Sequence, residues 1–235
     1  MGPPLNLAAL ALCAMAAALA SPAQAADAAH PTVIELFQSQ GCSSCPPAAA
    51  NVAALADRPD ILALSFQVTY WDQLGWKDTF AQPKFTARQW DYAHALHHDN
   101  VFTPQVVVNG RKDGVGVDAH DLGALIVRAD RGAGGPAVTL VKGAALIGAG
   151  GTLKTPADVW LVRFDPHTVW ISIRAGENGG KTLPHRNVVR QLVRLGGWSG
   201  SAMRFALPAS PDAGWREAVL VQTAGAGPIL AAGRG

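Results

Sequence analysis

Two cysteines separated by two residues, set between an apolar run and a helix-forming segment, limit most strongly what this chain can fold into. The run Val33–Phe37 is nearly continuous in apolar residues, which is typical of a strand buried on both faces. Cys42 and Cys45 follow it, and residues 48–56 are rich in alanine, a strong helix former. A second apolar run covers residues 61–68. Strand, helix and strand in this order predict two parallel strands joined by a right-handed crossover.

A threonine and a proline open the next apolar run. Residues 70–100 form a long excursion, and the second half of it has apolar residues at helical spacing. Thr103 and Pro104 then precede a run of three valines at 106–108. The Asn-Gly pair that follows is a hairpin signal, so we expect residues 115–117 to form the partner strand.

The expected order of these elements resembles the thioredoxin arrangement. A closing helix is expected from Asp118, as its N-cap, to about Arg131. The whole order is then strand, helix, strand, helix, hairpin and helix. The residues that carry the resemblance are the pair Cys42 and Cys45 after the first strand, and Pro104 at the start of the later hairpin.

A narrower resemblance covers residues 35–47, with the sequence ELFQSQGCSSCPP. This segment is similar to the signature ELFxSQGCSSCPP of a secreted bacterial family of unknown function, which is thioredoxin-like in its first half. The resemblance implies a thioredoxin-like domain over residues 26–133. It also implies a cis bond between Thr103 and Pro104, with Pro104 against the cysteine pair and the Thr103 backbone placed to pair with a substrate strand.

The spacing of the cysteines predicts a redox site. Two intervening residues let both sulfurs meet across the first turn of a helix, where the helix dipole and free N–H groups favour thiolate over thiol. We expect Cys42 to be the exposed, attacking thiol and Cys45 to be the shielded, resolving thiol. Two other interpretations stay open: the pair is a set of metal ligands, or it is an inert structural bridge.

Three further residues are candidates for supporting roles. Glu35 interrupts the first strand, and as a buried acid it could exchange a proton with Cys45; alternatively it faces solvent at the sheet surface. Trp71 and Trp76 lie on the long excursion. They either line a substrate groove beside the cysteines or pack a small core.

The functional hypothesis is an exported thiol–disulfide oxidoreductase that needs no cofactor. Its partners are expected to be protein thiols or disulfides, or an upstream redox protein. A second hypothesis is a copper-binding protein or metallochaperone, in which a histidine joins Cys42 and Cys45 as the third ligand. A third is a non-catalytic interaction protein. Separately, His94, His97 and His98 lie close together on one expected helix, where His94 and His98 could touch one metal; alternatively they form a partly solvated helix end, and we expect no metal site.

The N-terminus predicts the compartment. Residues 7–20 are almost wholly apolar, and Ala23-Gln24-Ala25 is a small-x-small cleavage site, so residues 1–25 are expected to be a signal peptide. The run is too short for a membrane span. Cys13 lies inside it, so cleavage leaves Cys42 and Cys45 as the two remaining cysteines. The mature protein is therefore expected in the periplasm or outside the cell, where disulfides persist.

After residue 133 the sequence changes character. Short apolar runs separated by turn signals predict an antiparallel, sandwich-like β domain over residues 134–235. The runs expected to be strands are 137–141, 159–164, 169–173, 188–195, 217–221 and 228–232. A net charge of +2, with 15% charged residues and no basic cluster, argues against nucleic-acid binding. The predicted fold class is thus α/β, with a thioredoxin-like first domain and a β-rich second domain.

Overall fold

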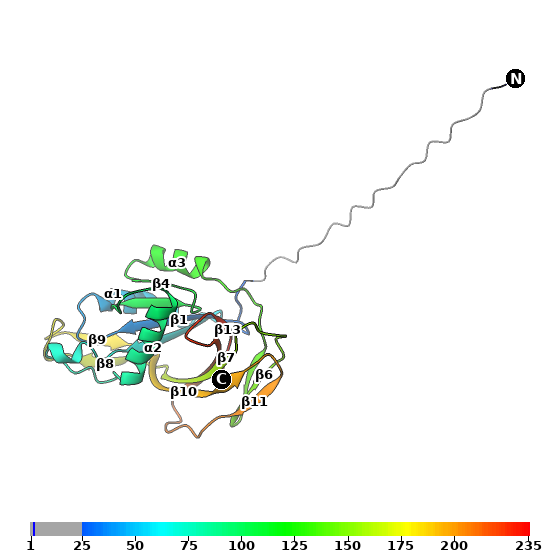
Figure 1. Ribbon diagram of the computed structural model, residues 1–235. Coiled ribbons are helices and arrows are strands. Elements are labelled where there is room, and N and C mark those ends of the chain that lie inside the picture. Colours follow the sequence, from blue (N-terminus) through cyan, green and yellow to red (C-terminus); the bar gives the residue numbers. More distant parts are fainter. Residues whose placement is uncertain (1, 3–24) are drawn as a thin grey trace.

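The computed structural model describes residue 2 and residues 25–235 of the chain (Figure 1). The predicted signal peptide, with Cys13, lies outside them apart from Gly2 and Ala25. The helical elements of the described part are α1 (Cys45–Ala54), η1 (Asp72–Leu74), α2 (Pro83–Ala95) and α3 (Ala119–Arg128). The strands are β1 (Thr32–Gln38), β2 (Ile61–Gln67), β3 (Gln105–Val108), β4 (Lys112–Gly114), β5 (Val138–Val141), β6 (Ala144–Ile147), β7 (Ala157–Asp165), β8 (Val169–Ser172), β9 (Thr182–His185), β10 (Val188–Trp198), β11 (Met203–Ala206), β12 (Arg216–Thr223) and β13 (Ile229–Arg234). None of the helices in this part is long and apolar enough to cross a membrane.

The first half of the chain has the predicted order of elements. β1 and β2 are parallel, and β3 runs antiparallel to β1. Side chains alternate between the faces of a strand. On one face Ile34 and Leu36 pack against α1 and α3, and on the other Val33 and Phe37 pack with residues of α2. The partner strand of β3 was predicted three residues too late, because the tight turn at Asn109 and Gly110 brings β4 in register from Lys112 onward.

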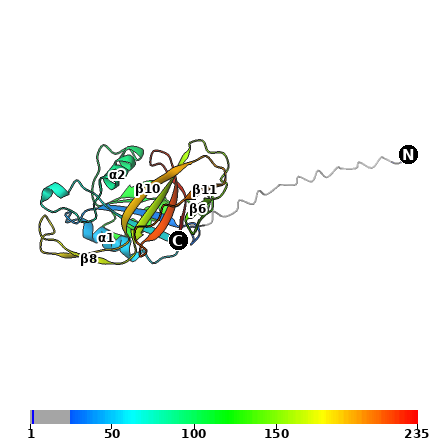
Figure 2. The ribbon, with the colours of Figure 1, turned by 90° about the horizontal axis from the view of Figure 1, so that it is seen from below.

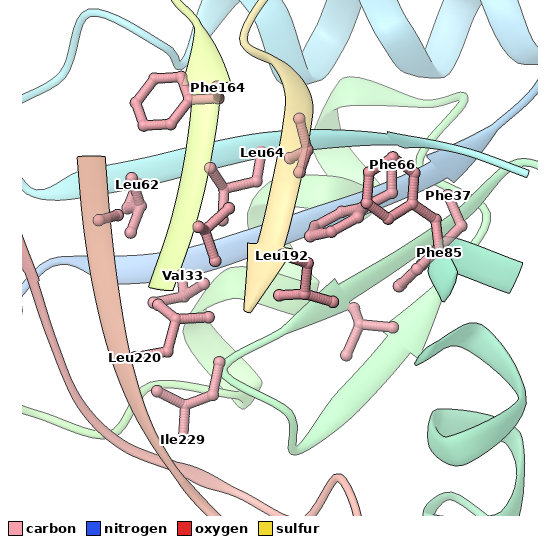
Figure 3. Close-up of a cluster of buried hydrophobic side chains, with 14 of the residues drawn as sticks. Val33, Phe37, Leu62, Leu64, Phe66, Phe85, Phe164, Leu192, Leu220 and Ile229 are labelled. Atoms are coloured by element: carbon pink, nitrogen blue, oxygen red, sulfur yellow. The ribbon is translucent and has the colours of Figure 1, made fainter. Parts of the chain in front are cut away.

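One large mixed sheet joins the two halves of the chain. Its strand order is β13-β12-β7-β10-β2-β1-β3-β4, and β10 pairs with β2 in parallel at Val188 and Ser65. The sheet curls, as Figures 1 and 2 show, and the N–H of Ile229 in β13 donates to the carbonyl of Asn109 over 2.9 Å. Figure 3 shows side chains from strands of both halves in one cluster inside the curl, among them Val33, Leu62, Phe164, Leu192 and Leu220.

The second half is β-rich. Its antiparallel strands β7, β10, β12 and β13 extend the large sheet, and a small sheet of order β11-β6-β5 packs against them. The strands predicted in this half are present, whereas β6, β9 and β11 were not predicted. The predicted boundary between residues 133 and 134 falls between α3 and β5; the division into two domains there stays a prediction.

Candidate functional site

The cysteine pair lies where the chain passes from β1 into α1. After β1 the N–H of Cys42 donates to the carbonyl of Ser39 over 3.1 Å, which closes a turn. Cys42 and Cys45 form a disulfide, with their Cα atoms 5.4 Å apart. Cys45 is the first residue of α1, and Pro46 and Pro47 follow, where a missing N–H costs least. The two sulfurs are thus held at the start of a helix, at the end of a buried parallel strand.

A hairpin from the second half of the chain covers this turn. We call β8, β9 and the loop between them, residues 169–185, the cap; it lies beside α1 in Figure 2. The side-chain amide of Asn178 donates to the carbonyls of Gln40 (3.0 Å) and Cys42 (2.8 Å), and Asn178 is fully buried. The carboxylate of Glu177 accepts from the N–H (3.0 Å) and hydroxyl (2.7 Å) of Ser43. Four hydrogen bonds therefore tie the cap to the cysteine turn.

The expectation that Cys42 is exposed is wrong. Its exposed fraction is 0%, against 1% for Cys45, while Ser43 and Ser44 between them are exposed. The cap contributes to this burial, because the Asn178 side chain lies against the main chain of Cys42. A partner molecule can therefore reach the Cys42 sulfur only after the segments packed around it move.

The first turn of α1 has fewer free backbone N–H groups near the sulfurs than we expected from the sequence. The N–H of Cys45 donates to the carbonyl of Cys42 over 3.2 Å, the N–H of Ser43 is bound by Glu177, and the two prolines have none. Hydrogen bonds from the Ser43 hydroxyl and N–H lower the pKa of Glu177, so a negative charge lies one residue from Cys42. This charge opposes the effect of the helix dipole on a Cys42 thiolate.

The Thr103–Pro104 segment lies at the same end of the strands as the cysteine turn. Gln105, the first residue of β3, pairs with Phe37 near the end of β1, which places Pro104 at that end. The bond between Thr103 and Pro104 is cis. The indole N–H of Trp71 donates to the Thr103 hydroxyl over 2.7 Å. Trp71 also lies close to Gly41, because a Cβ atom added to Gly41 would be 3.8 Å from the Cβ of Trp71. This tryptophan therefore links the Thr103–Pro104 segment to the cysteine turn.

Trp76 also contacts the segment before the cysteines. Its indole N–H donates to the side-chain carbonyl of Gln40 over 2.9 Å, and the carboxylate of Asp78 accepts from the Gln40 N–H over 2.7 Å. Burial raises the pKa of Asp78 to about 6. The tip of the cap reaches the same place, because a methyl group on Gly176 would lie 3.4 Å from the Cβ of Trp76. Both predicted tryptophans thus belong to the surroundings of the site.

Glu35 is not brought together with the cysteines. It is fully buried in an ion pair with Arg88 of α2, with distances of 2.7 Å and 3.0 Å, and it also accepts from the hydroxyl of Tyr92. Arg88 further donates to the side chain of Gln222 over 3.0 Å. This network is on the α2 face of the sheet, and Cys45 begins the helix on the other face. The alternative that Glu35 faces solvent is also wrong, because the curled sheet and α2 enclose it.

The histidines near residue 94 have other neighbours. His98 lies 2.9 Å from the carboxylate of Asp113, and the ring of His94 lies near that of Trp90, with centroids 6.0 Å apart. Within the part of the chain that the structure describes, one group of three potential metal ligands lies close together. It is at the start of α3 and consists of Asp118, His120 and Asp121, all exposed. Asp118 caps α3 there, as predicted, and copper binding by the cysteine pair stays a hypothesis.

Sequence reasoning missed three residues that shape the site: Asp78, Glu177 and Asn178. Asn178 is followed by two glycines, and the triplet signalled a turn without showing what that turn contacts. Asp78 lies two residues after Trp76, but its contact is with Gln40, 38 residues earlier in the chain, and no local pattern in the sequence signals that contact.

The fold and the site define a mixed α/β protein with a capped cysteine pair at the start of a helix. The chain belongs to the family described as "Protein of unknown function (DUF1223)", whose profile matches residues 33–222. It is similar to the crystal structure of protein AGR_C_4864 from Agrobacterium tumefaciens: 32% identity, 90% of this chain and 95% of that chain covered, TM-score 0.72. A likeness in fold alone extends to HBP35 of Porphyromonas gingivalis, at 13% identity, 88% and 74% coverage and a TM-score of 0.60. No curated protein matches the chain.

Proposed function

We propose that this protein is an exported thiol–disulfide oxidoreductase with a thioredoxin-like arrangement over residues 26–133. The observation that carries the proposal is the disulfide between Cys42 and Cys45 at the first turn of α1, directly after the central strand β1. The segment Thr103–Pro104 at the same end of the strands supports it, since Pro104 has no N–H to compete for the sulfurs. The export part of the proposal rests on the leader-like residues 1–25.

The exchange follows ordinary thiol chemistry. In the reduced protein the Cys42 thiolate attacks a substrate disulfide, which forms a mixed disulfide and releases one substrate thiolate. Cys45 loses its proton and attacks the Cys42 sulfur, which closes the protein disulfide and releases the second substrate thiolate. The same steps in reverse oxidise a substrate dithiol. Glu35 has no part in this scheme, because its ion pair with Arg88 lies on the opposite face of the sheet.

The cap controls access to the pair. Both of its anchors, Asn178 and Glu177, bind the main chain of the segment from Gln40 to Ser43. A substrate chain that displaces the cap gains these main-chain groups as hydrogen-bonding partners, as in strand addition to an open edge. We therefore expect an extended polypeptide as the substrate.

Covalent trapping in the exported compartment tests the proposal. Cys45→Ala should accumulate mixed disulfides with partner proteins, because the resolving thiol is missing. Cys42→Ala is the matched control and should trap few or none. Titration of the pair against glutathione then gives its reduction potential. Equal trapping by both variants contradicts the assigned roles, and an uncleaved N-terminus contradicts the export proposal.

A second candidate is a non-catalytic interaction protein with a structural disulfide. The complete burial of Cys42 under the cap favours it. In that case neither variant traps a partner, and the disulfide of the native protein resists dithiothreitol.

A further inference from the structure

A cavity of about 170 Å³ lies beside Cys45, between α1, the sheet and the cap. Its walls are mostly apolar and come from three elements. α1 contributes small side chains, the sheet contributes Leu36 and Leu64, and the cap contributes the segment 183–185; the α1 residues are Cys45, Pro46, Ala49, Ala50, Val52 and Ala53. An apolar cavity of roughly 150 Å³ accepts a molecule the size of benzene.

The cavity also has a polar wall. Gln38 and Ser65 line it from the sheet, Ser39 from the turn after β1, and His185 from the end of β9. His185 is 3% exposed, and among the described residues neither of its ring nitrogens has a hydrogen-bond partner. A buried polar group without a partner costs about 1–3 kcal/mol. A ligand that supplies that partner therefore recovers this cost.

The walls favour an uncharged ligand. Burial lowers the pKa of His185 to about 4, so the imidazole is neutral near pH 7 and offers one donor and one acceptor. Arg186 is the one residue of the cavity wall with a permanent charge, and it pairs with Asp57 at 2.5 Å, while its Nε is buried without a hydrogen-bond partner among the described residues. Because Asp57 already balances the Arg186 charge, a carboxylate would leave a net negative charge buried in the cavity, which is costly, whereas a hydroxyl can accept from this N–H without that cost.

We propose that this cavity binds a small, uncharged ligand with an apolar body and one hydroxyl group, of the size of phenol, and that His185 is its hydrogen-bonding partner. A hydroxyl can both donate and accept, which matches a neutral imidazole. The site is independent of the redox proposal, because its walls are complete in the oxidised protein.

The test uses the oxidised full-length protein and three probes of similar size: phenol, toluene and benzoate. Binding is followed by backbone amide chemical shifts, which also locate the site. We expect shifts at α1 and β9 and about fivefold tighter binding of phenol than of toluene, the value of one net hydrogen bond. Benzoate should bind more weakly than both.

Three variants connect the result to the cavity. His185→Leu has a similar volume and should bind phenol and toluene equally. Ala53 is a half-buried helix residue that lines the cavity. Ala53→Leu should fill the cavity and abolish binding of every probe. This variant tests the location of the site even if His185→Leu does not fold. His120→Leu alters an exposed histidine and should change nothing.

Phenol binding that survives Ala53→Leu would overturn the location of the site. Equal binding of phenol and toluene by the unmodified protein, or tighter binding of benzoate than of phenol, would overturn the ligand class. An absence of binding up to the solubility of phenol would overturn the whole inference.

Discussion

The side-chain amide of Asn178 donates to the carbonyl of Cys42 over 2.8 Å. Asn178 lies 136 residues further along the chain, so this hydrogen bond ties the cap to the cysteine turn. The reactivity of the cysteine pair therefore depends on two segments that are far apart in the sequence. The hydrogen bond also separates access to the disulfide from the chemistry of the sulfurs themselves.

Asn178→Ala should make the disulfide easier to reduce. The substitution removes the two hydrogen bonds to Gln40 and Cys42, and each such bond contributes about 1 kcal/mol net. The open state of the cap should then be populated at least about tenfold more, since local opening follows the same energetics. The measurement is the rate of reduction by dithiothreitol. Asn51→Ala is the control, because Asn51 donates twice to main-chain carbonyls away from the cap and should leave the rate unchanged.

Glu177→Gln should lower the pKa of the Cys42 thiol in the reduced protein. Gln keeps an acceptor for the Ser43 hydroxyl and N–H but removes the negative charge, which disfavours a nearby thiolate. Thiolate absorbance against pH, or the rate of alkylation against pH, measures the change. Asp121→Asn removes another exposed charge, on α3, and should leave the pH profile of the thiol unchanged. An unchanged pKa in Glu177→Gln would show that the cap carboxylate does not act on the sulfur.

Glu35→Gln should destabilise the protein without changing the chemistry of the cysteines. Removing one partner of a buried ion pair leaves Arg88 buried without its counter-charge, at a cost of about 3–5 kcal/mol. Urea unfolding of the oxidised protein measures the loss. Asp158→Asn, which breaks an exposed pair with Arg194, should cost about 0–1 kcal/mol. If Glu35→Gln instead shifts the pH dependence of disulfide exchange, then the acid does act as a proton relay.

The first half of the fold could be predicted because its signals are local. Continuous apolar runs gave β1 and β2, and the alanine-rich segment between them gave α1. The strands β6, β9 and β11 escaped prediction, and β9 contains Pro184, which argues against a strand in a sequence pattern. The pairing of β10 with β2 rests on a single pair of residues, Val188 and Ser65, for which no local pattern exists.

The site could be predicted where its residues are close in sequence to the cysteines or to Pro104. The position of Glu35 was open to prediction, since the alternation along β1 puts it on the face of Val33 and Phe37, away from Ile34 and Leu36. The cap could not be foreseen. Glu177 lies 134 residues from the serine that it binds, and an exposed Glu in a glycine-rich loop has no signature of its own.

Protonation of His185 in acid favours the unfolded chain over the folded protein. Burial lowers the pKa of His185 from 6.5 to about 4 in the folded protein. Between these two values the unfolded chain binds a proton that the folded protein does not, so stability is lost as the pH falls, by up to about 3 kcal/mol. Above pH 6.5 the group is neutral in both states and contributes no slope.

Asp78 acts in the opposite direction over nearly the same range. Its pKa rises from 3.8 to about 6 on folding, so its contribution to stability decreases as the pH rises between these values. The two slopes largely cancel in the unmodified protein, and a variant is needed to separate them. In His185→Leu the free energy of unfolding should therefore fall from pH 4 to pH 6, whereas the unmodified protein should change little over that range. Urea unfolding at a series of pH values measures both curves, with His120→Leu as the exposed-histidine control. Parallel curves for the unmodified protein and His185→Leu would mean that His185 titrates alike in the folded and unfolded chain.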